Sequence, residues 1–288
     1  MSIELPEAAI VAVQMKGLVE GKKIASFQLK DTERLQVTGF VNRELHDFDV
    51  LAGAVINQVT VRGSTILARL DRASTLLIAP EYGGVILYHA HASERPVRFH
   101  LCLVFSDATA LTIRLTGMGA LQLVPDDGLP SNYMYQRDYL HGADPLDAGS
   151  MTEAEFCRTL DGQARMLKAV LVGRDAVFVG IGNAAFEDIA YRSGIHPRRK
   201  AAELGTPERC ALYQAMRAVL TERIELGGKA GFVDLDGKPG RYRAAVGPGS
   251  AGAPCPRCGA LFAGVSIGGG TSYFCPHCQP EAPPPAVP

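Results

Sequence analysis

Four cysteines near the C-terminus constrain the fold of this 288-residue chain more than any other feature. Cys255 and Cys258 form one C-x2-C pair, and sixteen residues separate it from a second pair, Cys275 and Cys278. Each pair places two sulfurs on one tight turn, and two such turns facing each other make a tetrahedral thiolate cage for zinc. Because four protein ligands leave no open position, we expect one structural Zn²⁺. Two disulfides are the alternative, which the acidic N-terminal sequence, unlike a secretory signal, disfavours.

The positive charge of the chain is concentrated in one segment. The net charge is −1 and 47% of the residues are hydrophobic, which describes a globular protein with an ample core. No apolar run reaches the roughly 20 residues that span a bilayer. Residues 190–245, however, carry 11 Lys and Arg against 6 Asp and Glu. This local excess of cations predicts contact with a phosphate backbone, with a solvated helix face as the alternative.

The periodicity of the chain divides it into a β half and a helical half. Pro6 and Glu7 suit the first turn of a helix that ends at Gly21. From residue 23 to about 124, short runs rich in β-branched residues alternate with turn residues, which predicts a sandwich or barrel. After a Pro- and Gly-containing break, helices are expected near 152–161, 163–172, 184–193 and 207–226. Thr152 and Glu155 form the signature of a capping box at the start of the first.

Five motifs, taken in order, resemble the formamidopyrimidine-DNA glycosylase and endonuclease VIII (Fpg/Nei) family of base-excision repair enzymes. They are Glu4-Leu5-Pro6-Glu7, Val179-Gly180-Ile181-Gly182-Asn183, Ser193-Gly194-Ile195-His196-Pro197, Asp236-Gly237-Lys238-Pro239-Gly240 and the four-cysteine finger. The resemblance implies an α+β multidomain fold with a leading helix and three folded parts. These are an N-terminal β-sandwich (1–125), a helix–two-turns–helix domain (151–245) and a zinc finger (250–280). A linker (126–150) and a disordered tail (281–288) complete the expected organisation.

The resemblance also implies how DNA is held. A damaged double-stranded DNA is expected in a cleft between the two halves, bound by a monomer in the cytoplasm, or at the nucleoid if the source is bacterial. Gly182 lets backbone N–H groups approach a phosphate at a helix start, and Asn183 can donate its amide to the same phosphate. The cations expected to follow the backbone are Arg198, Arg199, Lys200, Lys238, Arg241 and Arg243.

Several positions depart from the family pattern. Ile3 stands where the family has a catalytic proline whose amine forms a Schiff base with the sugar. An amine on Ser2, after removal of the initiator methionine, would be displaced by one residue. Ser64 replaces a hairpin lysine, the segment 116–119 replaces an arginine that fills the gap left by the flipped base, and Gly270 replaces an arginine of the finger. The nucleophile and three cations are therefore absent together.

The acidic residues at the front of the chain are retained. Glu4 corresponds to the family's catalytic acidic residue, and Glu7 lies three residues further on, so the two carboxylates could share a proton or activate water. We therefore expect a DNA N-glycosylase that releases a damaged base by hydrolysis, with Glu4 as the acid or base and without Schiff-base lyase action. On this hypothesis damaged duplexes yield abasic sites and no borohydride-trapped adduct. Simple helix capping by Glu7 is the structural alternative.

Two other functions stay open on the sequence alone. The lost cations favour a non-catalytic protein that binds damaged DNA, and neither the finger nor the basic segment distinguishes DNA from RNA. The sequence does not name the lesion.

Three histidines form a separate feature. His89 and His91 would point the same way on a strand, with His100 downstream, and they could form a second metal site or a proton relay. Because no fourth ligand is evident, histidines that are simply hydrogen-bonded are the alternative that we favour.

Overall fold

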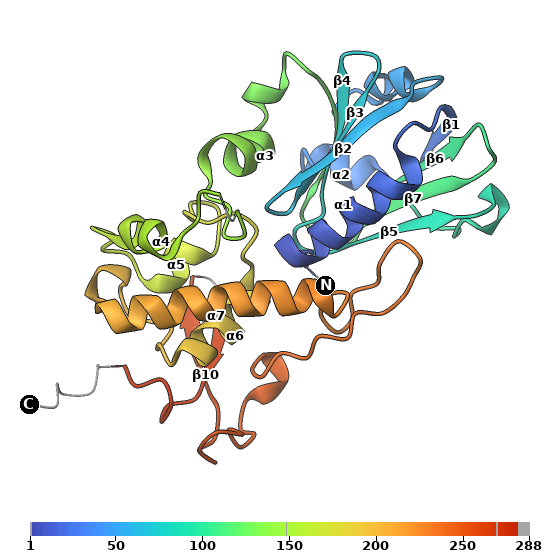
Figure 1. Ribbon diagram of the computed structural model, residues 1–288. Coiled ribbons are helices and arrows are strands. Elements are labelled where there is room, and N and C mark those ends of the chain that lie inside the picture. Colours follow the sequence, from blue (N-terminus) through green and yellow to red (C-terminus); the bar gives the residue numbers. More distant parts are fainter. Residues whose placement is uncertain (1, 148, 269, 282–288) are drawn as a thin grey trace, which may run out of the picture. The chain divides into compact units, whose positions relative to one another are not determined.

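The structure is a computed structural model that describes residues 2–147, 149–268 and 270–281 (Figure 1). The described chain divides into two compact units. The first runs to His141 and also takes in Arg223–Tyr242, whereas the second contains Gly142–Glu222 and the chain from Arg243 onward. These boundaries differ from the expected ones, since residues 126–141 and 223–242 both join the N-terminal unit. Of the tail expected to be disordered, only Glu281 is among the described residues.

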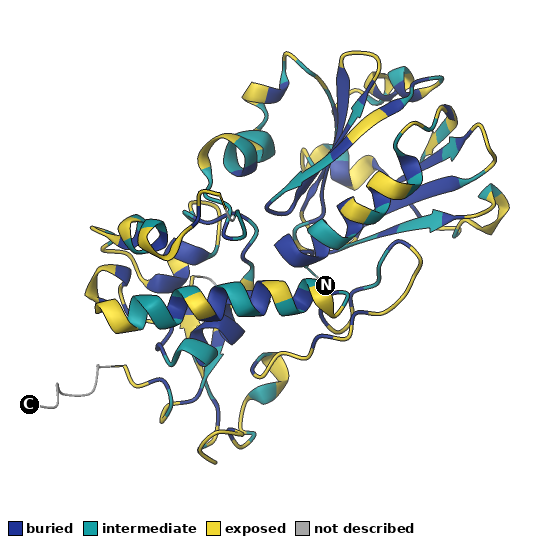
Figure 2. Ribbon diagram, in the orientation of Figure 1, coloured by how far each residue is buried: buried dark blue, intermediate teal, exposed yellow. Residues whose placement is uncertain are grey.

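Two four-stranded antiparallel sheets form the first unit. One has the order β2-β3-β4-β8, with strands Ile56–Arg62, Thr65–Leu70, Ser74–Ala79 and Ala120–Pro125. The other has the order β1-β6-β7-β5, with strands Ile24–Leu29, Leu101–Phe105, Ala110–Leu115 and Gly84–His89. Aliphatic side chains of both sheets, such as Ile66 and Ile113, belong to one buried cluster. Strands β3, β4, β6 and β7 are buried along most of their length, whereas β1, β2 and β5 are more exposed (Figure 2). The predicted β-sandwich is confirmed.

The leading helix α1 (Leu5–Val19) lies where the sequence places it. Pro6 and Glu7 occupy its first turn, where a missing N–H is harmless and a negative charge is favoured. Val11 and Met15 are buried in the sandwich core, and the helix packs against β2 and β3. Val13 and Lys16 on the opposite face are exposed. This packing fixes the front of the chain against the sheet.

Short helical turns connect and cover the sheets. They are α2 (Glu33–Val37), η1 (Leu45–Leu51), η2 (Ala92–Glu94), η3 (Leu129–Ser131), α3 (Tyr133–Tyr135) and η4 (Gln136–His141). The last three fall in the segment that the sequence treats as a linker. Tyr135 and Tyr139 stack with ring centroids 5.1 Å apart, and both pack against Leu77 and its neighbours on the sheet that contains β4. This apolar contact explains why residues 129–141 belong to the sandwich unit.

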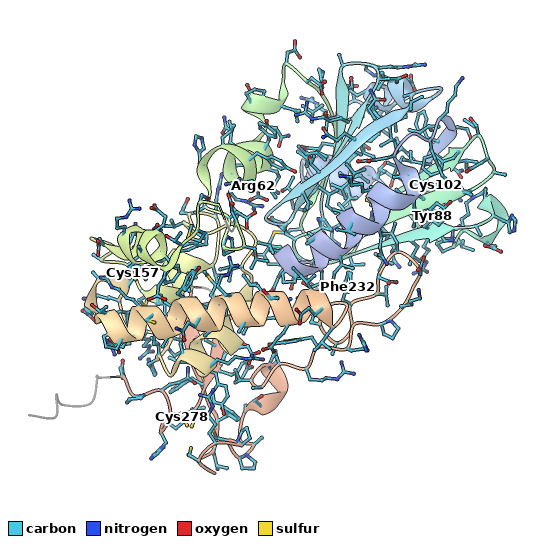
Figure 3. All side chains as sticks on the ribbon, viewed as in Figure 1. Arg62, Tyr88, Cys102, Cys157, Phe232 and Cys278 are labelled. Atoms are coloured by element: carbon cyan, nitrogen blue, oxygen red, sulfur yellow. The ribbon has the colours of Figure 1, made fainter. Side chains whose placement is uncertain are left out.

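The segment 223–242 also packs on the sandwich. Phe232, which Figure 3 labels, and Leu235 belong to the sandwich core. The backbone N–H of Tyr88 in β5 donates to the carbonyl of Leu235 at 2.8 Å. The segment begins with the last turn of the long helix α7 (Thr206–Glu225). The front of the chain and this late segment are therefore parts of one compact unit.

Helices and a small zinc-finger hairpin form the second unit. Its elements are α4 (Glu153–Leu160), α5 (Leu167–Leu171), α6 (Asn183–Ser193), η5 (Ala201–Glu203), most of α7, η6 (Pro248–Ser250), β9 (Ala263–Ile267) and β10 (Gly270–Phe274). The hydroxyl of Thr152 accepts from Glu155 N at 3.2 Å, as the capping signature predicts. Gly194 ends α6 with φ of 74°, a left-handed conformation that glycine adopts readily. None of the described helices is both long and apolar enough to cross a membrane.

Candidate functional site: a zinc finger and a buried ionic cluster at the N-terminus

The four finger cysteines form one compact group of sulfurs. Their Sγ atoms all lie within 4.8 Å of one another, and Figure 3 marks Cys278 among them. The Cys255–Cys278 and Cys258–Cys275 sulfur distances are 3.9 and 3.5 Å. Four sulfurs about 2.3 Å from a tetrahedral zinc would be roughly 3.8 Å apart. The arrangement therefore fits a closed, structural Zn²⁺ site, as the sequence predicts.

Hydrogen bonds favour the thiolate form of one of the four cysteines, Cys255. Burial alone would raise the pKa of Cys255, but hydrogen bonds from the Tyr191 hydroxyl and from the N–H groups of Arg257 and Cys258 lower it to about 6. At Cys278, burial and the neighbouring sulfurs raise the pKa to about 12. The two directions differ because crowded sulfurs cannot all be charged without a cation among them. Zn²⁺ supplies that charge when bound.

The finger is attached to the helical unit through residues around α6. The Tyr191 hydroxyl lies 3.2 Å from Cys255 Sγ, and the guanidinium of Arg257 lies 4.3 Å from the Tyr191 ring centroid. Gln279 donates to the carbonyl of Ile195 at 2.9 Å and accepts from Cys275 N at 2.9 Å. Zinc ligands and helix are thus joined by hydrogen bonds that hold the ligands in place.

A second cluster of charged side chains lies at the start of α1. Arg223, from the end of α7, donates from Nη1 to Glu4 at 2.8 Å and from Nη2 to both carboxylate oxygens of Glu7 at 2.8 and 2.7 Å. All three side chains are at most 3% exposed. Glu7 also accepts from the backbone N–H of Glu4 at 3.1 Å. The two carboxylates are therefore bridged by an arginine and do not share a proton.

Lys229 completes this cluster. Its Nζ lies 3.3 Å from Glu4 Oε1 and donates to Ser2 Oγ at 3.0 Å, and its backbone N–H donates to Glu7 at 3.1 Å. Burial alone would raise the pKa of Glu4, but the charges and hydrogen bonds of Arg223 and Lys229 outweigh this and lower the pKa to about 2. Glu4 is a carboxylate at neutral pH. We call these five residues, Ser2, Glu4, Glu7, Arg223 and Lys229, the N-terminal cluster.

Sequence reasoning found the two acids of the N-terminal cluster and missed its two cations. Arg223 and Lys229 lie more than 215 residues from their partners, so no spacing along the chain connects them. The one local signal is Gly227-Gly228 directly before Lys229. Gly228 has φ of 95°, and this left-handed turn brings the lysine round after the helix ends.

The cations predicted to contact DNA differ in exposure. Arg198 and Lys200 in the second unit are about half exposed, and Lys238, Arg241 and Arg243 are exposed. Arg199 is different, because its side chain is 6% exposed and donates to both carboxylate oxygens of Glu208 at 2.9 and 3.2 Å. The buried side chain of Arg199, paired with Glu208, does not match the exposed phosphate contact that the sequence predicts for it. Arg199 is buried, whereas the side chains before and after it, Arg198 and Lys200, are exposed.

Gly182 and Asn183 lie at the start of α6, as the sequence predicts. Gly182 is the N-cap residue, the preceding Gly180 has φ of 72°, and Asn183 is the first helical residue and is exposed. The positive end of the helix dipole and an exposed side-chain amide therefore lie at the same place. This is an arrangement suited to an anion.

The structure also describes the positions that depart from the family pattern. Ser64, at the lysine position of the hairpin, accepts from Arg137 Nη2 at 3.4 Å, and that arginine is ion-paired with Asp138 and Glu81. Met118, in the segment that lacks the arginine, is 48% exposed. Gly270 opens β10 and is exposed. The guanidinium of Arg137 therefore lies beside the β2–β3 hairpin, a neighbour that the sequence alone did not indicate.

The histidines do not form a metal site within the described residues. Strand β5 ends at His89, so His91 lies beyond it at the start of η2, and the expected strand alternation of the two is wrong. His89 Nε2 is 2.9 Å from Thr112 Oγ1, and His100 Nδ1 accepts from Leu115 N at 3.0 Å. Among the described side chains, the four cysteines are the group with metal-ligand geometry.

The chain thus combines a β-sandwich, a helical unit with an attached four-cysteine finger, and a buried acidic pair at the front of the chain. Family descriptions match three successive parts of the chain. They are "Formamidopyrimidine-DNA glycosylase N-terminal domain" over residues 3–117, "Formamidopyrimidine-DNA glycosylase H2TH domain" over 141–233, and "Zinc finger found in FPG and IleRS" over 252–280.

Known proteins resemble the chain over almost its whole length. The formamidopyrimidine-DNA glycosylase of Exiguobacterium sp. is 30% identical over 281 residues, which cover 96% of this chain and 98% of that protein. The corresponding enzyme of Neisseria meningitidis is 29% identical, with coverage of 96% and 100%. The chain belongs to the formamidopyrimidine-DNA glycosylase family.

Solved structures show the same fold. MutM (Fpg) of Thermus thermophilus matches with a TM-score of 0.78 and 28% identity, covering 97% of this chain and all of that one. Lactococcus lactis Fpg, in a complex with DNA that contains an abasic site, matches with a TM-score of 0.81 at 22% identity, covering 96% and 99% of the two chains.

Proposed function

We propose that this protein is a DNA N-glycosylase that binds damaged double-stranded DNA as a monomer in the cytoplasm and releases a damaged base by hydrolysis. The observation that carries the proposal is the ionised carboxylate of Glu4, which Arg223 and Lys229 hold at the front of α1. Relatives named formamidopyrimidine-DNA glycosylase cover almost the whole chain, which supports the same reaction class.

The ionised state of the Glu4 carboxylate limits the roles that this residue can have in base release. As the glycosidic bond breaks, positive charge develops on the sugar, and a fixed negative charge nearby stabilises it. A carboxyl group with a pKa near 2 carries no proton to donate at neutral pH, so Glu4 acts as a carboxylate that stabilises the cation and orients water. Glu7 holds the Glu4 backbone and Arg223 and is a positioning residue. Because Ile3 replaces the proline, the proposed base release does not use the family's Schiff-base step on that proline.

The proposed DNA contacts lie on both units. At the start of α6, Gly182 and Asn183 would bind one phosphate. Five exposed cations would neutralise others, namely Arg198, Lys200, Lys238, Arg241 and Arg243. Arg199 is left out of this set because Glu208 already pairs with it.

One observation favours a second candidate, a protein that binds damaged DNA without cleaving it. The charges of the N-terminal cluster compensate one another, and Glu4 is only 3% exposed. A neutral buried cluster of this kind also serves to tie the 223–242 segment to α1. On this alternative the two glutamates are structural.

Comparison of the wild type with Glu4→Gln separates the two functions. Both proteins are incubated with duplexes that contain oxidised, ring-opened or alkylated bases, and mass spectrometry detects the free bases. The glycosylase predicts a released base with the wild type and a loss of at least about 100-fold with Glu4→Gln, at unchanged DNA affinity. Glu33→Gln, at an exposed position of α2, is the matched control. No released base from any duplex, with binding intact, would favour the binding protein.

A further inference from the structure

Lys229 places a primary amine at the very front of the folded chain. Its side chain is 10% exposed, and its Nζ contacts Ser2 Oγ at 3.0 Å and Glu4 Oε1 at 3.3 Å. Ser2 directly precedes Ile3, the residue at the position of the family's proline. A side-chain amine therefore lies beside the location from which the N-terminal amine is missing.

The backbone around Lys229 holds this side chain in place. Ala230 N donates to the carbonyl of Tyr242 at 3.0 Å, and Tyr242 N donates to the carbonyl of Gly228 at 3.0 Å. A Cβ on Gly240 would lie 2.4 Å from the carbonyl oxygens of Gly228 and Lys229, so only glycine permits this close pairing. The turn that presents Lys229 is thus packed on both sides, and the amine has a defined position.

Charge compensation calls for a second cation beside Arg223, which balances only one of the two carboxylates, but it does not specify a lysine. Glu4 already accepts a hydrogen bond from Arg223 at 2.8 Å, and Glu7 accepts two from the same guanidinium. Burying an ammonium group costs free energy that its partners must offset. A lysine can also lose its proton and attack a carbonyl carbon, whereas an arginine stays protonated.

We propose that Lys229 is an amine nucleophile that forms a Schiff base with the aldehyde of an abasic site and cleaves the strand by β-elimination. The activity goes beyond base release, because its substrate is the abasic product. It rests on the proposed binding of DNA at the N-terminal cluster and does not depend on the glycosylase step. The proposal departs from the expectation of no lyase action and no borohydride-trapped adduct, which was drawn from the missing proline and did not consider Lys229.

The reaction balances with Lys229, Glu4 and water. The ammonium of Lys229 gives one proton to solvent water, and the free amine attacks C1′ of the open-chain sugar. The hydroxyl of the resulting carbinolamine takes a proton back from water and leaves as water, which gives a protonated imine that the carboxylate of Glu4 stabilises. Water then takes the C2′ proton as the C3′–O bond breaks, and the phosphate leaves with the bonding electron pair. Hydrolysis of the imine regenerates the ammonium of Lys229 and releases an unsaturated aldehyde, while the C2′ proton stays in the solvent.

Borohydride trapping on a preformed abasic site tests the proposal. The zinc-loaded, full-length protein is mixed with a duplex that contains one abasic site, at a concentration that saturates binding, and sodium borohydride is added. Reduction of the imine leaves a stable secondary amine, which peptide mass spectrometry assigns to a residue. The proposal predicts that the adduct maps to Lys229, a result that needs no variant.

Two variants sharpen the test. Lys229→Arg keeps a cation beside Glu4 but cannot form the imine, so the adduct and strand cleavage should fall to the level without protein while abasic-duplex binding persists. Lys16→Arg, at an exposed lysine of α1 in the same unit, should form the borohydride-trapped adduct as the wild type does.

Four results would each overturn the proposal. They are no binding, no adduct at saturating binding, an adduct on the N-terminal amine, and undiminished trapping by Lys229→Arg. Base release from lesion duplexes is scored separately, so failure of the lyase leaves the glycosylase assignment standing.

Discussion

Glu7 at the start of α1 and Arg223 at the end of α7 are joined by two short hydrogen bonds, although 216 residues separate them in the chain. Neither side chain is more than 1% exposed. Because Arg223 also binds Glu4, one guanidinium holds both acids that the sequence marks as candidates for chemistry. The N-terminal cluster therefore depends on the folding of residues 223–242 onto the sandwich.

Loss of Arg223 should destabilise the protein strongly. Arg223→Met leaves Glu4 and Glu7 buried without their main counter-charge, and the free energy of unfolding should fall by about 3–5 kcal/mol. Equilibrium unfolding in urea measures the change. Arg34→Met, at an exposed position of α2, should stay within about 0.5 kcal/mol of the wild type. Equal stability of the two variants would show that the cluster is not a structural link.

Acid should lower the free energy of unfolding because Glu4 becomes protonated. Its pKa is about 2 in the fold against 4.5 for an unperturbed glutamate side chain, so the folded state binds the proton of Glu4 less readily than the unfolded chain does. The stabilisation is then complete above about pH 5 and disappears as the pH falls towards 2, with a loss of about 3 kcal/mol at roughly 1.4 kcal/mol per pKa unit. Glu4→Gln should flatten the stability curve in this window, whereas Glu33→Gln should not. A wild-type curve that is already flat between pH 5 and 2 would refute this.

The zinc site should weaken when its hydrogen-bond partner is removed. Tyr191→Phe keeps the ring that contacts Arg257 but loses the hydroxyl at 3.2 Å from Cys255 Sγ, and zinc affinity should fall roughly 10–100-fold. Competition with a chelator measures the affinity, and metal analysis should find one zinc per wild-type chain. Tyr213→Phe, whose hydroxyl donates to the carbonyl of Met151, should bind zinc as the wild type does. Unchanged affinity in Tyr191→Phe would leave the hydroxyl without a role at the metal.

Two adjacent arginines should give opposite phenotypes. Arg198→Ala should reduce the slope of log affinity for DNA against log salt by about 1 and leave unfolding unchanged, because one phosphate contact is lost. Arg199→Ala removes charged hydrogen bonds to Glu208 and should lower the free energy of unfolding by about 2 kcal/mol. Salt-titrated binding and thermal unfolding of both variants provide the comparison. If Arg199→Ala instead lowered the slope of log affinity against log salt and unfolded like the wild type, Arg199 would be a DNA contact and not a structural residue.

Local sequence signals were sufficient to predict most of the helices, the β region and the zinc ligands. The C-x2-C pairs, the Thr152 cap and the Pro6-Glu7 helix start each act over a few residues, and all lie in the structure where the sequence predicts them. The sequence predicts β structure from 23 to about 124 without the bounds of the strands, and Gly63, with φ of 58°, forms the turn of the β2–β3 hairpin. The helix expected at 163–172 is shortened to Leu167–Leu171.

What the sequence by itself determined is the set of short-range features: the zinc ligands, the succession of strands and helices, and the acids at the front of the chain. These follow from turn chemistry, capping and periodicity, which act between neighbours. Only the tertiary structure decided which cations meet those acids, that Arg199 is buried while Arg198 is exposed, and that Lys229 lies beside Ser2. The reason is physical, since the partners of a buried charge are chosen by packing between segments far apart in the chain, and no local pattern records that choice.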